Sequence, residues 1–266
     1  MGYSGQAHRW TTRLFLIICL CLLHSAVYAA AILVTDNRLV NSQGNVSSQT
    51  TTQTWTVEER SPGNFGTFDF MVDETRTAGT NAASSNASLT SNITDSLFTA
   101  NASAGSSSIL NESGNPSRSS SSGRASFEAT FQILTPTTFD LTGNLSFLKG
   151  AGSSRGGATL SLFNGCCSNT FSISLGNSSV FNDFSQNIQL SGLLDPDTYT
   201  LRAQASVNAD NFSVGSPESG TAAFDFNFVL GSNGAAVAPV PVPAAVWLFG
   251  SAIGLLGWMR RRVDQS

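Results

Sequence analysis

Histidine is nearly absent from this chain of 266 residues. The two that it has, His8 and His24, both lie within the first 31 residues. Imidazole is the general base of a Ser-His-Asp triad, the partner of a catalytic cysteine and a common zinc ligand. The rest of the chain lacks the side chain on which these chemistries depend. We therefore expect no catalytic residues, no metal centre and no cofactor.

Charged side chains are also scarce, at 11% of the sequence. The full chain has 13 basic and 17 acidic residues and a formal charge of -4. Without residues 1–30 and 244–266, which are interpreted below as processing signals, five basic residues and one acidic residue are lost. That leaves 8 basic and 16 acidic residues, a charge of about -8, and Lys149 as the only lysine. Such a chain has no basic surface for a nucleic-acid partner.

Residues 1–30 have the pattern of a secretory signal peptide. Two arginines precede an apolar core at residues 14–23, and three alanines follow at positions 29–31. Such a leader directs export through the Sec translocon and is removed by cleavage, here after Ala29 or after Ala31. We therefore expect the residues that follow to lie outside the inner membrane.

The last part of the chain, residues 240–262, has the pattern of a short membrane segment. Residues 244–259 are apolar and uncharged. A helix of that length would span roughly 24 Å, against about 30 Å for the hydrocarbon core of a bilayer. The motif Pro241, Val242 and Pro243 precedes the run, and the cluster Arg260, Arg261 and Arg262 follows it. Arginines directly after a span favour the cytoplasmic side.

This order of a proline motif, a short span and an arginine cluster resembles the PEP-CTERM protein-sorting signal. The resemblance is confined to the tail, and Val242 stands where the name-giving motif has glutamate. It implies recognition by an exosortase, a membrane cysteine protease or transpeptidase of Gram-negative bacteria that make exopolysaccharide. The alternatives are an ordinary C-terminal anchor and a buried core helix.

Residues 31–230 show the alternation that is typical of half-buried β-strands. Phe127, Ala129 and Phe131 alternate with polar residues, and residues 170–175 and 222–230 repeat the pattern. Glycine and proline turns separate the strands, and no long amphipathic helix is indicated. We predict an all-β fold with a single β-sandwich of jelly-roll type. A flexible linker follows at residues 231–239.

Residues 77–124 form a low-complexity stretch of Ser, Asn, Ala, Gly and Thr. Leu89, Ile93 and Leu97 recur at intervals of four, but Ser, Thr and Asn are poor residues for the interior of a helix. We expect irregular strands and loops here, with residues 117–123 as the clearest loop. A solvated linker is the alternative.

Two passages of the sequence resemble each other. Residues 122–131 and 219–228 share Ser-Gly, Ala, Phe, acidic and Phe positions. The similarity occurs once and over a long interval, which argues against a solenoid. We interpret the two passages as equivalent strands in the two sheets of one sandwich.

Cys166 and Cys167 are the only cysteines outside the leader. Export would place them in an oxidising compartment. A vicinal disulfide, pairing with other chains and free thiols are all open to them, although adjacent cysteines lack the separation of a relaxed bridge. A catalytic role is not expected, because no histidine is present to activate a thiol.

Other candidate groups are less specific. Acids around Asp195, Asp197 and Asp210 could bind Ca²⁺ in loops, although Asp-Pro-Asp is also an ordinary turn. No two carboxylates stand out as a pair for glycoside hydrolysis. The aromatic residues Trp55, Phe181 and Tyr199 could stack on sugar rings.

The sequence thus predicts an exported, non-enzymatic bacterial protein. It would be held in the inner membrane for a time, sorted by an exosortase-like enzyme, and delivered to the cell surface or the extracellular matrix with exopolysaccharide. A carbohydrate-binding β-sandwich module is the alternative function. A glycan-active enzyme is the third hypothesis.

Overall fold

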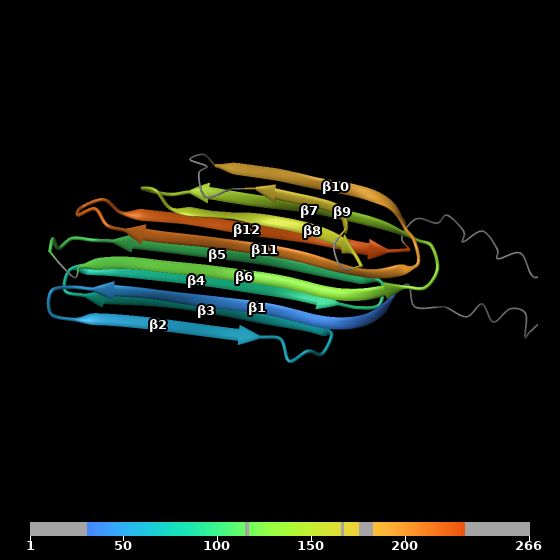
Figure 1. The fold of residues 1–266 in the computed structure, drawn as a ribbon, viewed down its shortest axis with the longest axis horizontal. Helices are drawn as coiled ribbons and strands as arrows, with labels where there is room; N and C mark the ends of the chain where they lie inside the picture. Colours follow the sequence, from blue (N-terminus) through green and yellow to red (C-terminus); the bar gives the residue numbers. More distant parts are fainter. Residues whose placement is uncertain (1–30, 115–116, 166–167, 176–182, 232–266) are drawn as a thin grey trace, which may run out of the picture.

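The computed structural model describes residues 31–114, 117–165, 168–175 and 183–231, and within them the chain folds into β-strands without helices (Figure 1). The strands are β1 (Ile32–Ser47), β2 (Thr52–Arg60), β3 (Gly66–Ala78), β4 (Asn81–Ile93), β5 (Leu97–Ile109), β6 (Arg118–Ile133), β7 (Thr137–Lys149), β8 (Arg155–Asn164), β9 (Ser168–Leu175), β10 (Phe184–Leu194), β11 (Asp197–Asn211) and β12 (Glu218–Leu230). Over this part of the chain, no helix of a length and hydropathy suited to crossing a membrane occurs. The leader, the tail and all but Gly231 of the linker lie outside the described residues.

The strands form two six-stranded antiparallel sheets, which we name sheet A and sheet B. Sheet A has the order β2-β1-β6-β11-β8-β9, and sheet B has the order β10-β7-β12-β5-β4-β3. The strands of both sheets run along the long axis of the molecule (Figure 1). The predicted all-β sandwich is confirmed.

The pairing of strands β5 to β12 is nested along the chain. β5 pairs with β12, β6 with β11, β7 with β10, and β8 with β9. The first and third pairs lie in sheet B, and the second and fourth lie in sheet A. This part of the chain therefore wraps around the core as one long double ribbon, and β1 to β4 extend the two sheets on one side.

Alternation of small or apolar residues with polar ones places each strand between core and solvent. In β6, Ala125, Phe127, Ala129 and Phe131 are buried between the sheets, and the residues between them face outward. The passages that resemble each other lie in β6 of sheet A and β12 of sheet B, as predicted.

The two halves of the sandwich have different cores. The half in which β1 begins and β12 ends (Figure 1) is filled with aromatic rings. Phe98, Phe131 and Phe228 form one group, with ring centroids 5.0 to 5.8 Å apart. Phe127 and Phe226 meet edge to face at 5.1 Å. Tilted and edge-on contacts of this kind are the favourable arrangements of aromatic side chains.

The other half of the sandwich is thin, and hydroxyl groups join its two sheets. Ser42 of β1 bonds to Ser85 of β4 (Oγ–Oγ 2.6 Å), and Ser106 of β5 bonds to Ser121 of β6 (2.7 Å). All four serines are buried. The Nε1 of Trp55 donates to Ser42 Oγ at 3.2 Å and to Ser85 Oγ at 3.3 Å. Each hydroxyl thereby has a partner, which removes most of the cost of burying it.

The expectation of irregular strands and loops in residues 77–124 was wrong. Most of the stretch lies in β4, β5 and β6, and six of the seven residues of the predicted loop 117–123 belong to β6. Serine, alanine and glycine occur here because the space between the sheets is narrow. Their outward-facing neighbours are polar as well, so the usual contrast between the two faces is missing from the sequence.

The two sheets approach each other closely at Gly123 of β6. A Cβ atom at this position would overlap the carbonyl oxygens of Asn86 in β4 and Gly105 in β5, the latter at 2.5 Å. Both oxygens belong to the backbone of the opposite sheet, so they cannot move aside as a flexible side chain could. The two sheets therefore meet through their main chains at this position.

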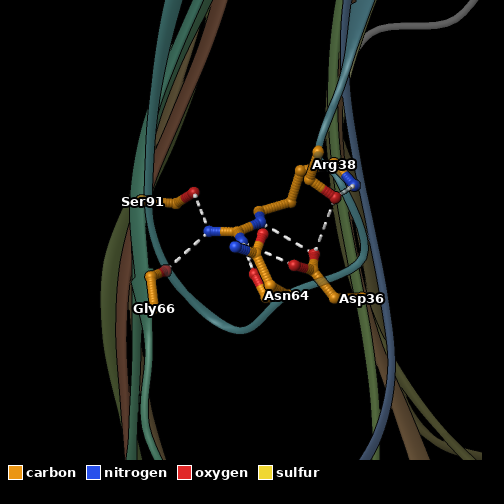
Figure 2. Close-up of polar contacts among 6 residues, drawn as sticks. Asp36, Arg38, Asn64, Gly66 and Ser91 are labelled. Atoms are coloured by element: carbon orange, nitrogen blue, oxygen red, sulfur yellow. Dashed lines mark hydrogen bonds and ion pairs between the residues drawn. The ribbon is translucent and has the colours of Figure 1, made fainter.

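A buried ion pair lies in the aromatic half of the sandwich, beside the β2–β3 connection. The side chains of Arg38 and Asp36, both in β1, are fully buried, and their charged atoms are 2.5 Å apart. Figure 2 shows that the Arg38 guanidinium also reaches Asn64 in the connection, Gly66 in β3 and Ser91 in β4. Together with Asp36, these partners occupy all five N–H donors of the guanidinium. A buried charge with every donor satisfied fixes this connection against both sheets.

We predict that Gly123→Ala destabilises the fold by about 1–3 kcal/mol, the usual cost of overpacking a tight core. Chemical denaturation of the wild-type chain and the variant measures the difference. Ser122→Ala is the matched control, because Ser122 is the outward-facing neighbour on the same strand. Its effect should stay within about 0.5 kcal/mol. Equal stability of the two variants would contradict the described contact between the sheets.

Candidate functional site

The outer face of sheet B carries ordered rows of amide, hydroxyl and carboxylate side chains. Direct pairing of the strands aligns one outward-facing residue from each strand, so every row runs across the sheet. The first row is Thr67, Asn92, Thr99, Asn227, Thr142 and Gln189. The second row is Asp69, Thr90, Asn101, Asp225, Asn144 and Asn187.

These two rows line a groove that crosses β3, β4, β5, β12 and β7. The groove has a volume of about 690 Å³, and its lining includes nine of the twelve residues in the rows. Five neighbouring strands span roughly 19 Å at the usual spacing, so the groove is long compared with one small molecule. The buried residues Phe68 and Phe226 form part of its floor.

Most polar groups in the groove point to solvent. Asp69, Asn101, Asp225 and Asn227 are all exposed. Asp69 accepts a hydrogen bond from Thr90 Oγ1 at 2.9 Å. Amides offer both donors and acceptors, and carboxylates offer acceptors only. The groove can therefore hydrogen-bond a ligand that is rich in hydroxyl and other N–H or O–H groups.

The aromatic residues that we considered for sugar stacking do not line this groove. Trp55 is 7% exposed and lies between the sheets, where it bonds to the two serines described above. Tyr199 is 3% exposed, and its ring stacks on Phe131. Phe181 lies outside the described residues. For Trp55 and Tyr199, the idea of exposed stacking platforms was wrong.

The Tyr199 hydroxyl has a structural role at the start of β11. It donates a hydrogen bond to the backbone oxygen of Asp195 at 3.1 Å. Burial raises the pKa of this hydroxyl above its ordinary value of 10.0, and the charges of Asp197 and Asp195 raise it further. The group is therefore neutral at physiological pH and acts there as a hydrogen-bond donor.

The three acids considered for Ca²⁺ binding do not come together. Asp195 and Asp197 lie before and at the start of β11, whereas Asp210 is near its far end. Thirteen residues of extended chain separate Asp197 from Asp210 by about 40 Å. Asp210 instead faces Arg118 at 3.8 Å. Within the described ranges, no group of three His, Cys, Asp or Glu side chains is placed to hold a metal ion.

The other site residues named from the sequence lie outside the described residues. They are the sorting motif and the cysteine pair: Pro241, Val242, Pro243, Arg260, Arg261, Arg262, Cys166 and Cys167. The groove itself was not found from the sequence. The one sign of it in the sequence is that Asp69 and Asp225 each stand between two phenylalanines.

Comparisons with known proteins place the chain in no family. No family model and no curated protein matches it. One solved structure that aligns with it, of the Gx strain of infectious bursal disease virus, has a TM-score of 0.27 and 11% identity, and covers 77% of this chain and 70% of that one. Another, a GH31 alpha-xylosidase from Xanthomonas citri, has a TM-score of 0.18 and 11% identity, and covers 76% and 28%. Similarities this distant say nothing about function.

We predict that Trp55 reports on the fold but not on a ligand of the sheet B face. Trp55 is the only tryptophan in residues 31–238. Its emission in that fragment should be blue-shifted and resistant to quenching by iodide, because the ring is buried. Addition of a glycan that binds should leave the emission unchanged. A strong change on binding would indicate that the ligand lies at Trp55 rather than in the groove.

Proposed function

We propose that this protein is an exported, non-enzymatic surface or extracellular protein of a Gram-negative bacterium. A signal peptide at residues 1–30 would direct its export, and an exosortase-like enzyme would process the tail at residues 240–262. A short membrane helix at residues 244–259 would hold the precursor in the inner membrane until then. The processed chain would associate with exopolysaccharide or with the biofilm matrix.

The position of the two chain ends supports this proposal. The N–H of Ala31 bonds to the backbone oxygen of Asp95, and the N–H of Leu230 bonds to that of Ser96. The chain therefore enters and leaves the sandwich beside the same β4–β5 turn. A precursor held by its tail would present the far, thin half of the sandwich and both sheet faces away from the bilayer.

The strand order supports the assignment of the sandwich to the jelly-roll type. In such folds a long antiparallel ribbon rolls up so that successive pairs alternate between two sheets. The nested pairs of β5 to β12 follow that scheme. We treat β1 to β4 as an extension of the roll. Jelly rolls serve many functions, so this assignment alone implies none.

Binding of a glycan by the outer face of sheet B is the second proposed function. The observation that favours it is the groove, where Thr, Asn and Asp side chains from five strands line one continuous surface. Amides and hydroxyls in fixed register suit the hydroxyl groups of a linear sugar chain. This binding would attach the exported protein to the matrix.

The tail is tested by expressing the chain with and without residues 240–266 in an exosortase-positive host and in its exosortase deletion strain. We expect the full chain to be shortened and released only in the positive host. The truncated chain should have the same size and location in both hosts. Identical size and location of the full chain in the two strains would rule out exosortase sorting.

Glycan binding is tested with the double variant Asn101→Ala and Asn227→Ala, which removes two exposed amides from the groove. We expect binding to the polysaccharide of the producing strain to weaken by about 1–3 kcal/mol, since each neutral hydrogen bond contributes about 0.5–1.5 kcal/mol. Polysaccharide pull-down and calorimetry give the measurement.

The control is Asn45→Ala with Asn208→Ala, which removes two amides from the outer face of sheet A. This variant should bind as the wild-type chain does. Equal retention of both double variants would show that the groove is not the binding site. No retention of the wild-type chain would leave the sorting proposal standing without this second function.

A further inference from the structure

The two outer faces of the sandwich differ in charge. On sheet B, every outward-facing charged residue of the described strands is acidic: Asp69, Asp73, Asp140 and Asp225. On sheet A, the outward-facing charged residues are of both signs: the arginines Arg60, Arg118, Arg124, Arg155 and Arg202, and the acids Glu58, Glu128 and Asp210. A surface of one sign attracts ligands of the other sign and repels those of its own. The groove therefore lies on a face that disfavours an anionic polymer.

Two of these carboxylates lie inside the groove and in the same row. Asp69 of β3 and Asp225 of β12 are separated by Thr90 and Asn101 on the two strands between them. Three strand spacings place the carboxylates about 14 Å apart. A polymer that crosses the strands along this row would meet a carboxylate, a hydroxyl, an amide and a second carboxylate in turn.

This separation suits binding rather than glycoside hydrolysis. Retaining glycosidases hold their two carboxyl groups about 5 Å apart, and inverting enzymes hold them about 6.5–9.5 Å apart. Asp69 and Asp225 exceed both ranges, and both are exposed to solvent. They are therefore available as acceptors for ammonium and hydroxyl groups of a bound chain.

We propose that the groove binds a linear polysaccharide that carries free amino groups, such as a partly deacetylated polymer of hexosamine. The chain would lie across the strands, with ammonium groups at Asp69 and Asp225 and sugar hydroxyls at the Thr and Asn side chains of the two rows. This inference rests on the proposed glycan binding and names the class of glycan. An acidic polysaccharide in the groove would instead meet the carboxylates of Asp69 and Asp225.

The test uses the exported chain, purified as the host processes it, and two oligosaccharides of equal length. One is an oligomer of glucosamine and the other is its fully N-acetylated form. Titration calorimetry at low and high salt should give tighter binding of the glucosamine oligomer at low salt, and high salt should reduce the difference. An oligolysine of matched charge serves as a control and should bind more weakly, because it lacks the sugar hydroxyls.

Charge-removing variants then locate the ammonium groups. Asp69→Asn and Asp225→Asn should each weaken binding of the glucosamine oligomer by up to about fivefold at low salt, as expected for an exposed ion pair. Asp73→Asn is the matched control, because Asp73 lies on the same face and on the same strand as Asp69 but outside the groove. It should have little effect, and all three variants should keep the stability of the wild-type chain.

The outcomes separate this inference from the function on which it rests. Equal binding of the two oligosaccharides would overturn the preference for amino groups and leave glycan binding in place. The preference is also overturned if oligolysine binds as tightly as the sugar, or if Asp225→Asn and Asp73→Asn have the same effect. If neither oligosaccharide binds at any salt concentration, both this inference and the proposed glycan binding fail.

Discussion

The close approach of the two sheets at Gly123 is the constraint on which the thin half of the sandwich depends. At Gly123 a Cβ atom would overlap the backbone of the opposite sheet, and the neighbouring strands β4 and β5 place mainly serine and alanine side chains between the sheets. Hydroxyls in this narrow core pair with one another, as in the Ser42–Ser85 and Ser106–Ser121 pairs, although the buried Ser108 Oγ has no hydrogen-bond partner. This half is thus held by polar contacts between the sheets, and the aromatic half is held by ring packing.

The low-complexity stretch, residues 77–124, contributes side chains both to the interior and to the candidate site. In β4 and β5, Ser85 and Ser106 face the opposite sheet, while Thr90 and Asn101 face the groove. Each of these strands therefore has small polar residues on both faces. Because the backbone fixes the register of the central strands, the outward side chains fall into rows across the sheet. The groove itself lies over the aromatic half of the sandwich, where Phe68 and Phe226 form part of its floor.

A strand could be predicted from the sequence where the residues on its buried face are apolar and those on its outer face are polar. Strands such as β6 beyond Gly123 and β12 were predictable, because buried phenylalanines alternate with polar residues. In β4 and β5 a serine faces inward or outward with equal ease, so neither the strands nor the narrow core could be predicted from residue types. The groove could not be predicted, because Asp69 and Asp225 fall in one row only through the pairing of strands that include β5 and β12, which are distant in sequence.

The most direct test of the account is to locate a bound oligosaccharide by the amide chemical shifts that it perturbs. The account predicts that the largest changes occur at the two rows of β3, β4, β5, β12 and β7, with little change on sheet A. Changes centred on the outer face of sheet A, or on the loops at either end of the sandwich, would contradict the assignment of the sheet B face as the binding surface.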